Sequence, residues 1–109
     1  MKVQVRVHAR AVRDVESQAV FIAAESADAA ERIWDAFGMA IEQVAANPGI
    51  GKRWETDDSR IAGVRWWSLP GFDQHLLFYC ATDQRLDILR VIHGARDLST
   101  LFADEFDRD

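Results

Sequence analysis

The hydrophobic and polar positions change period along the first half of the chain. Valines alternate with polar residues over positions 2–8, a period of two that predicts a half-buried strand. From about Ala9 to Glu25 apolar side chains recur at helical spacing, and the same spacing returns after Ser26. Ser26 suits an N-cap, and Asn47-Pro48-Gly49 stops a helix. We therefore expect a strand and then two helices, joined by a break so short that it forces an antiparallel hairpin.

The second half of the chain returns to strand patterns after a polar stretch. Residues 49–60 contain glycine and many charges, which indicates a long loop. Strands are expected at about 61–69, 74–81 and 86–93, separated by turns at 70–71 and 82–84. The second half is thus predicted to be a meander of three strands.

The predicted strand at 86–93 is the one around which the sheet is organised. Both of its alternating sets contain apolar residues. In a strand with one buried and one solvent-exposed face, apolar and polar residues alternate more strictly. A central position in the sheet is therefore expected. Alternation assigns one apolar set to each face: Leu86, Ile88 and Ile92 on one, Leu89 and Val91 on the other.

The order of elements predicts the fold class. A strand, two helices and three strands, β-α-α-β-β-β, form an α+β two-layer sandwich with the helical hairpin packed on one face of the sheet. The length of 109 residues suits one domain that spans residues 1–109. Within it, residues 98–109 are expected to form a short helical turn and an acidic tail.

Charge and composition exclude some classes of function. The formal net charge is −5, whereas a protein that grips nucleic acid by its phosphates is usually basic, so direct stable nucleic-acid binding is not expected. The lone Cys80 fits a reducing compartment. No apolar run has the length of a membrane span, and the chain begins with alternation in place of a signal peptide. A cytoplasmic protein without a membrane anchor is expected.

The densest polar cluster lies at the end of the last predicted strand. It contains Arg90, His93, Arg96 and Asp97. A histidine flanked by guanidinium groups has the chemistry to transfer a proton or to hold an anion. The alternative is a structural turn, in which His93 bonds nearby backbone and Arg96 pairs with Asp97. Arg90 shares a face with core residues, so pairing with a carboxylate is expected for it.

Two further groups of side chains are candidates for binding. Lys52, Arg53 and Arg65 form a basic rim along the polar loop and the next strand. Trp66 and Trp67 are adjacent in that strand, so they point to opposite faces, and one of them is left on the open face. Several aromatic side chains are therefore candidates for a partner surface: Trp34, Trp66, Trp67 and an exposed Tyr79. The cysteine and the histidines show no paired ligand spacing, so no metal or cofactor is expected.

The stretch 90–97, Arg-Val-Ile-His-Gly-Ala-Arg-Asp, resembles the strand-end motif of the ParE branch of the ParE/RelE toxins. These are the toxic partners of bacterial type II toxin-antitoxin pairs. The start of the second helix at 27–32, its stop at 47–48 and the loop at 51–53 are also similar to this family. The resemblance follows the order of the elements from end to end. It implies an antiparallel sheet in which the first strand lies beside the last.

The resemblance also implies a function. Members of the ParE branch are neutralised by an antitoxin whose C-terminal segment folds as it wraps the toxin, and several of them poison DNA gyrase. A gyrase-binding toxin without bond-breaking activity, in a hetero-oligomer with a ParD-like or other antitoxin, is therefore the expectation. Two sets of contacts are expected: Lys52, Arg53, Arg65, Arg90, His93, Arg96 and Asp97 with the target, and Trp34, Trp66, Trp67 and Tyr79 with the antitoxin.

Two alternatives stay open. RelE-like relatives cut mRNA on the ribosome without a metal, using basic residues and usually a tyrosine or histidine near the C-terminus. This chain has no tyrosine after Tyr79 and its body is not basic, but His93 and Arg96 are the residues that an endoribonuclease would use. A protein that keeps the toxin fold as a non-toxic binding partner is the third possibility.

Overall fold

The computed structural model describes residues 3–54 and 63–94. Two helices, α1 (Ala9–Ala23) and α2 (Ala27–Ala46), form the predicted hairpin. Ser26 is the N-cap of α2, and its hydroxyl accepts a hydrogen bond from Ala29 N at 3.1 Å. This bond satisfies one of the amides that a helix start leaves unpaired. In the part of the chain that the structure describes, no helix is both long and apolar enough to span a bilayer.

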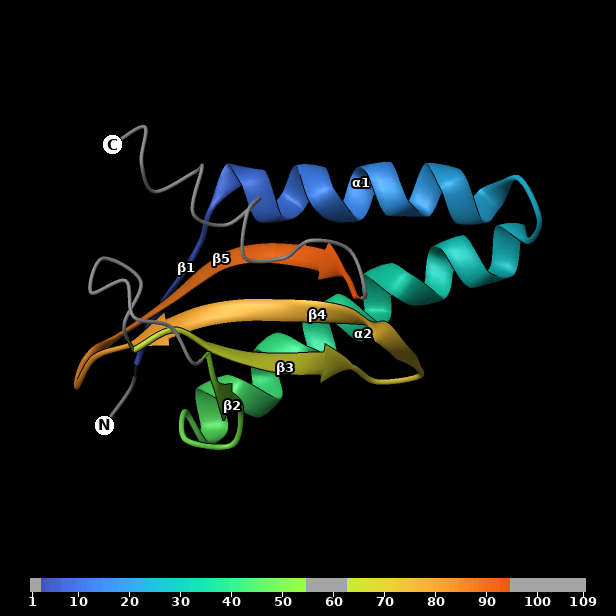
Figure 1. The fold of residues 1–109 in the computed structure, drawn as a ribbon. Helices are drawn as coiled ribbons and strands as arrows, with labels where there is room; N and C mark the ends of the chain where they lie inside the picture. The colour runs from blue at the N-terminus through green and yellow to red at the C-terminus, as the bar shows by residue number, and fades with distance from the viewer. Residues whose placement is uncertain (1–2, 55–62, 95–109) are drawn as a thin grey trace.

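The sheet has five strands, and the helical hairpin lies across one of its faces (Figure 1). Their order across the sheet is β1-β5-β4-β3-β2. The bounds are Gln4–Val7 for β1, Lys52–Arg53 for β2, Arg65–Leu69 for β3, Phe72–Ala81 for β4 and Arg85–His93 for β5. The predicted α+β sandwich with the first strand beside the last is confirmed. β5 is an interior strand as predicted, although β4 is the middle one.

The sheet is mixed, so the expectation of a wholly antiparallel sheet is wrong at one edge. β1 and β5 are parallel, whereas the other neighbouring strands are antiparallel. Parallel neighbours need a long connection, and here two helices and three strands intervene. β1 is also more exposed than its alternation predicted, with Val5 39% and Val7 41% exposed. The reason is its place at the margin of the sheet, where β5 is its one neighbouring strand among the described residues.

The loop predicted at 49–60 and the strand predicted at 61–69 differ from the structure in part. Lys52–Arg53, expected within the loop, forms the short strand β2 and pairs with β3. The strand expected at 61–69 begins at Arg65. The rest of the loop at 55–62 and the helical turn and tail expected at 98–109 lie outside the described residues.

A β-bulge in β5 corrects the predicted division of its faces. Phe78 pairs with Arg90 but Tyr79 pairs with Ile88, so Leu89 is an extra residue between two pairs. One extra residue reverses the faces of every side chain that follows. Val91 therefore joins Leu86 and Ile88 in the main core under the helices, and Ile92 lies with Leu89 in a second cluster.

The two apolar clusters occupy opposite faces of the sheet. The main core packs α1 and α2 against the strands and includes Ile33, Phe37, Leu77 and Tyr79. The second cluster contains Val64, Phe78 and Ile92, with Trp54 and Trp66 packed against it. The parity expected for the adjacent tryptophans is confirmed, because Trp67 packs in the main core and Trp66 in the second cluster.

Candidate functional site

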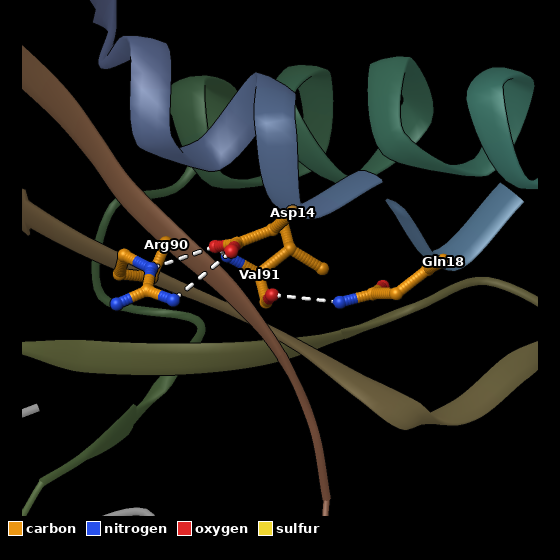
Figure 2. Close-up of polar contacts among 4 residues, drawn as sticks. All are labelled: Asp14, Gln18, Arg90 and Val91. Atoms are coloured by element: carbon orange, nitrogen blue, oxygen red, sulfur yellow. Dashed lines mark hydrogen bonds and ion pairs between the residues drawn. The ribbon is translucent and has the colours of Figure 1, made fainter. Parts of the chain in front are cut away.

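The outer edge of β5 is covered by β1 at one end and by α1 at the other. β1 pairs with β5 as far as Ile88, whose carbonyl also accepts a hydrogen bond from His8 N at 2.9 Å. Beyond that point the backbone of Val91 is bound by two α1 side chains. Asp14 Oδ2 accepts from Val91 N at 2.9 Å, and Gln18 Nε2 donates to Val91 O at 2.9 Å. Figure 2 shows the contact between Gln18 and Val91 at the edge of the strand.

Helical spacing explains how one helix binds both polar groups of one residue. Asp14 and Gln18 are four positions apart, so they lie on the same face of α1, one turn from each other. The carboxylate supplies an acceptor and the amide a donor. These side chains thus replace the ladder bonds that β1 makes further back along β5, and the strand edge is satisfied without another strand.

Asp14 also forms an ion pair with Arg90. Arg90 Nε and Nη2 donate to its two carboxylate oxygens at 2.7 and 2.9 Å (Figure 2). Both side chains are mostly buried, with 18% of Arg90 and 16% of Asp14 exposed. The two-point geometry is the strong form of this interaction. The carboxylate pairing predicted for Arg90 is therefore confirmed, and its partner lies on α1.

His93 lies beside a second histidine at the last residue pair of β4 and β5. His75 and His93 are register partners, and their ring centroids are 4.9 Å apart with an interplanar angle of 86°. His75 Nδ1 is 2.7 Å from Gln18 Oε1. Because Nε2 of the same amide donates to Val91 O, the oxygen accepts and His75 Nδ1 carries the proton. In the neutral ring, Nε2 of His75 then holds the lone pair.

The environment of His75 lowers its pKa. Burial is the larger cause, since it disfavours the charged ring, and the neighbouring His93 adds to it. The side chain is mostly buried, whereas His93 is exposed. At neutral pH His75 is therefore uncharged.

We expect this shift to make the folded chain less stable in acid. The unfolded chain binds a proton at His75 more readily than the folded chain does, so the contribution of neutral His75 is complete above about pH 6.5 and is lost as the pH falls through and below that value. Urea unfolding at pH 7.5, 6.5 and 5.5 measures the slope. His75→Gln is expected to flatten it and His8→Gln to leave it unchanged. Equal slopes in the two variants would contradict the assignment.

A pocket of about 550 Å³ lies between α1 and the ends of β4 and β5. Its polar wall contains the Asp14–Arg90 pair, Gln18 and the two histidines. Its apolar wall includes Phe21, which is 82% exposed at the rim. Within residues 3–54 and 63–94, no three histidine, cysteine, aspartate or glutamate side chains are placed to share a metal ion. The pocket has the features of a binding site with acid-base groups in its wall.

The basic rim expected along the loop lies away from this pocket. Lys52 and Arg53 pair with Trp66 and Arg65 at the β2–β3 edge. The Lys52 Nζ lies 5.3 Å from the centroid of the Trp66 ring, and Arg65 Nη1 donates to Gly51 O at 2.8 Å. One cross-strand row, Lys52, Trp66, Phe78 and Arg90, connects this edge to β5. The described target-binding candidates are therefore divided between two places, and Arg96 and Asp97 lie outside the described residues.

The aromatic candidates for a partner surface do not come together. Trp34 on α2 is 39% exposed, and Trp66 is half-buried on the opposite face of the sheet. Trp67 packs under α2, where its Nε1 donates to Gln43 Oε1 at 2.8 Å. Trp34 and Trp66 thus lie on different surfaces of the molecule, and Trp67 packs in the main core.

The expectation that Tyr79 is exposed is wrong. Its residue exposure is 0%, because it lies on the face of β4 that the helices cover. Its hydroxyl donates to Pro48 O at 2.7 Å and accepts from Gly51 N at 2.9 Å. Burial is the main cause that raises the pKa of Tyr79, opposed by the bond from Gly51 and the charge of Arg65. Tyr79 therefore anchors the segment after α2.

Sequence reasoning missed three residues of the pocket. In the sequence, Asp14 and Gln18 fall in a helical pattern and His75 in an alternating one, and neither pattern marks a site residue. The acceptor-donor pair at 14 and 18 has the spacing of one helical turn, which is a weak signal. Their partners are 57 to 77 residues away in the chain, so no local pattern could have identified them.

One family model matches most of the chain, and two solved structures share its fold. Residues 5–98 match the model of the family described as "ParE toxin of type II toxin-antitoxin system, parDE". A solved structure described as the chromosomal ParDE TA system from P. aeruginosa is 15% identical, with a TM-score of 0.70 over 86% of this chain and 98% of that one. A YoeB/ParE toxin from Agrobacterium tumefaciens is 16% identical, with a TM-score of 0.57 over 85% and 100%. No curated protein sequence matches significantly.

Proposed function

Since the chain belongs to the ParE toxin family of type II toxin-antitoxin systems, we propose that it inhibits growth by binding DNA gyrase and that a cognate ParD-like antitoxin neutralises it. The observation that carries this proposal is the family match over residues 5–98, which includes β5 and its histidine end. The similar P. aeruginosa structure is described as a ParDE system, which supports an antitoxin partner for this chain.

The described residues of the site support a toxin that acts by binding its target over one that cleaves RNA. The guanidinium of Arg90 donates to Asp14, so much of its charge is compensated inside the fold. Phosphate recognition usually relies on cations that face the ligand. Target contacts are proposed for Lys52, Arg53, Arg65 and His93 and, outside the described residues, for Arg96 and Asp97. Arg90 is assigned mainly to holding β5 against α1.

Antitoxin contacts are proposed for the aromatic side chains that the fold leaves at least partly exposed. Trp34 on α2 and Trp66 on the open face of the sheet are of this kind. Trp67 and Tyr79 pack in the main core, so we assign their roles to the fold. An antitoxin segment that reaches both Trp34 and Trp66 has to pass around the molecule, as an extended chain that folds on binding can do.

Growth and supercoiling assays test the proposal together. Induced expression of the chain is expected to stop growth, and co-expression of the protein encoded by the neighbouring reading frame is expected to restore it. Added to purified gyrase, the chain is expected to inhibit supercoiling or to trap cleaved DNA. Growth arrest with unaffected gyrase would reject the target and keep the toxin. Normal growth and unaffected gyrase would reject both and favour a non-toxic binding partner.

The two neighbouring histidines support one alternative function, which is catalytic. A neutral His75 and a more exposed His93 line one pocket, and unequal neighbours of this kind can act as base and acid. The alternative is ribosome-dependent cleavage of mRNA. It requires that primer extension on translated mRNA shows cuts, that His93→Ala abolishes them, and that His8→Ala does not. Absence of cuts during growth arrest would reject this alternative.

A further inference from the structure

The β4–β5 ladder ends on its two histidines. His75 and His93 are the last register partners before Gly94, whose amide donates to Gln74 O. The rings meet edge to face at 4.9 Å between centroids. Whatever changes the interaction of these rings therefore acts directly on the end of β5.

The buried ring is also connected to α1. Gln18 joins His75 Nδ1 to the carbonyl of Val91, so one amide links α1, β4 and β5. The ring of Phe72 meets the His75 ring edge to face, with centroids 5.8 Å apart. His75 is held by these contacts, whereas His93 is exposed at the strand end. A force between the rings is therefore expected to move His93.

Among the residues that the structure describes, the pocket wall carries one charge of each sign besides the histidines. The charged side chains that face the histidines are Asp14 from α1 and Arg90 from β5, and these form an ion pair with each other. β4 contributes no other titratable group to the pocket wall. Two protonated rings at this separation repel each other, and the described charges of the pocket wall offset this repulsion little because they pair with each other.

We propose that the His75–His93 pair is an acid-sensitive latch, which holds the end of β5 against β4 at neutral pH and releases it, widening the pocket beside α1, when both rings are protonated. The closed form binds fewer protons than the open form, because burial and the neighbouring ring both lower the pKa of His75. Acid therefore favours the open form. The repulsion alone changes the opening equilibrium roughly fourfold if it is screened as in water, and more at a lower effective dielectric constant.

Amide hydrogen exchange on the full chain tests the latch. The protection factor of the Gly94 amide, corrected for intrinsic exchange, is measured at pH 7.5 and pH 5. The reference is the His8 amide, which donates to Ile88 O in the middle of the same strand. Protection at Gly94 is expected to fall about fourfold or more, whereas protection at His8 stays constant.

Two variants separate the latch from general weakening in acid. His93→Asn removes one of the two charges at an exposed position and is expected to abolish the fall at Gly94, whereas the control His8→Asn is expected to retain it. An equal fall in wild type and His93→Asn would overturn the proposal. So would constant protection in wild type while ring proton resonances show that His75 and His93 have both titrated.

Discussion

Replacing Asp14 by alanine is expected to lower the free energy of unfolding by about 2–3 kcal/mol, measured by urea denaturation at pH 7.5. The substitution removes the acceptor of two Arg90 bonds and of the Val91 amide. It leaves a mostly buried guanidinium and a strand-edge amide without this partner, and such orphaned groups are costly. The value lies below that of a fully buried pair because both side chains retain some exposure.

Asp14→Asn is the matched control for the charge. An asparagine oxygen can still accept from Val91 N, while the ionic part of the Arg90 contact is lost. About half of the alanine effect is therefore expected for Asp14→Asn. If alanine and asparagine were both neutral, α1 would not secure the edge of β5. If the two were equally damaging, the charge would matter and the Val91 bond would not.

Replacing Gly51 by alanine is expected to destabilise the chain by about 1–3 kcal/mol, measured by urea or thermal unfolding. A Cβ at this position would lie 2.5 Å from Tyr79 Oη and 2.8 Å from Trp66 O. One of these is a backbone atom of β3, and the other is a hydroxyl held by Pro48 O. Neither can move away without the loss of a hydrogen bond or of sheet pairing.

Gly49→Ala is the control for this substitution. Two residues earlier in the same segment, the added Cβ would meet only Asn47 Oδ1, at 3.8 Å. We expect a change within about 1 kcal/mol, stabilising if the backbone accepts alanine without strain. Combining Gly51→Ala with Tyr79→Phe tests the cause, because removal of the hydroxyl should make the alanine less costly than in the wild-type background. Equal costs in both backgrounds would reject the clash with the Tyr79 hydroxyl.

Local patterns predicted the elements well where local physics decides them. Ser26 caps α2 because its hydroxyl reaches an amide three residues ahead, and this depends on no distant part of the chain. The opposite faces of Trp66 and Trp67 follow from strand geometry alone. The interior position of β5 followed from its two apolar sets.

The sequence predicted less of the candidate site. Alternation placed Ile92 with Leu86, and the bulge at Leu89 reversed that assignment, although nothing in the local residues marks a bulge there. Tyr79 was expected at the surface because an aromatic ring in a strand suits either face. His93 and Arg90 were singled out from their position at a strand end, but the three pocket residues Asp14, Gln18 and His75 were not.

By itself, the sequence determined the hairpin, the meander, the layer arrangement and the motif by which the family is identified, because capping, turn formation and side-chain period act over a few residues. Only the tertiary structure decided which groups meet. Asp14 and Arg90 are 76 positions apart, and Gln18 and His75 are 57 apart. They meet because β1 stops early beside β5 and α1 takes its place at the strand edge. The backbone groups exposed there have to be satisfied, and which side chains satisfy them depends on the path of the whole chain.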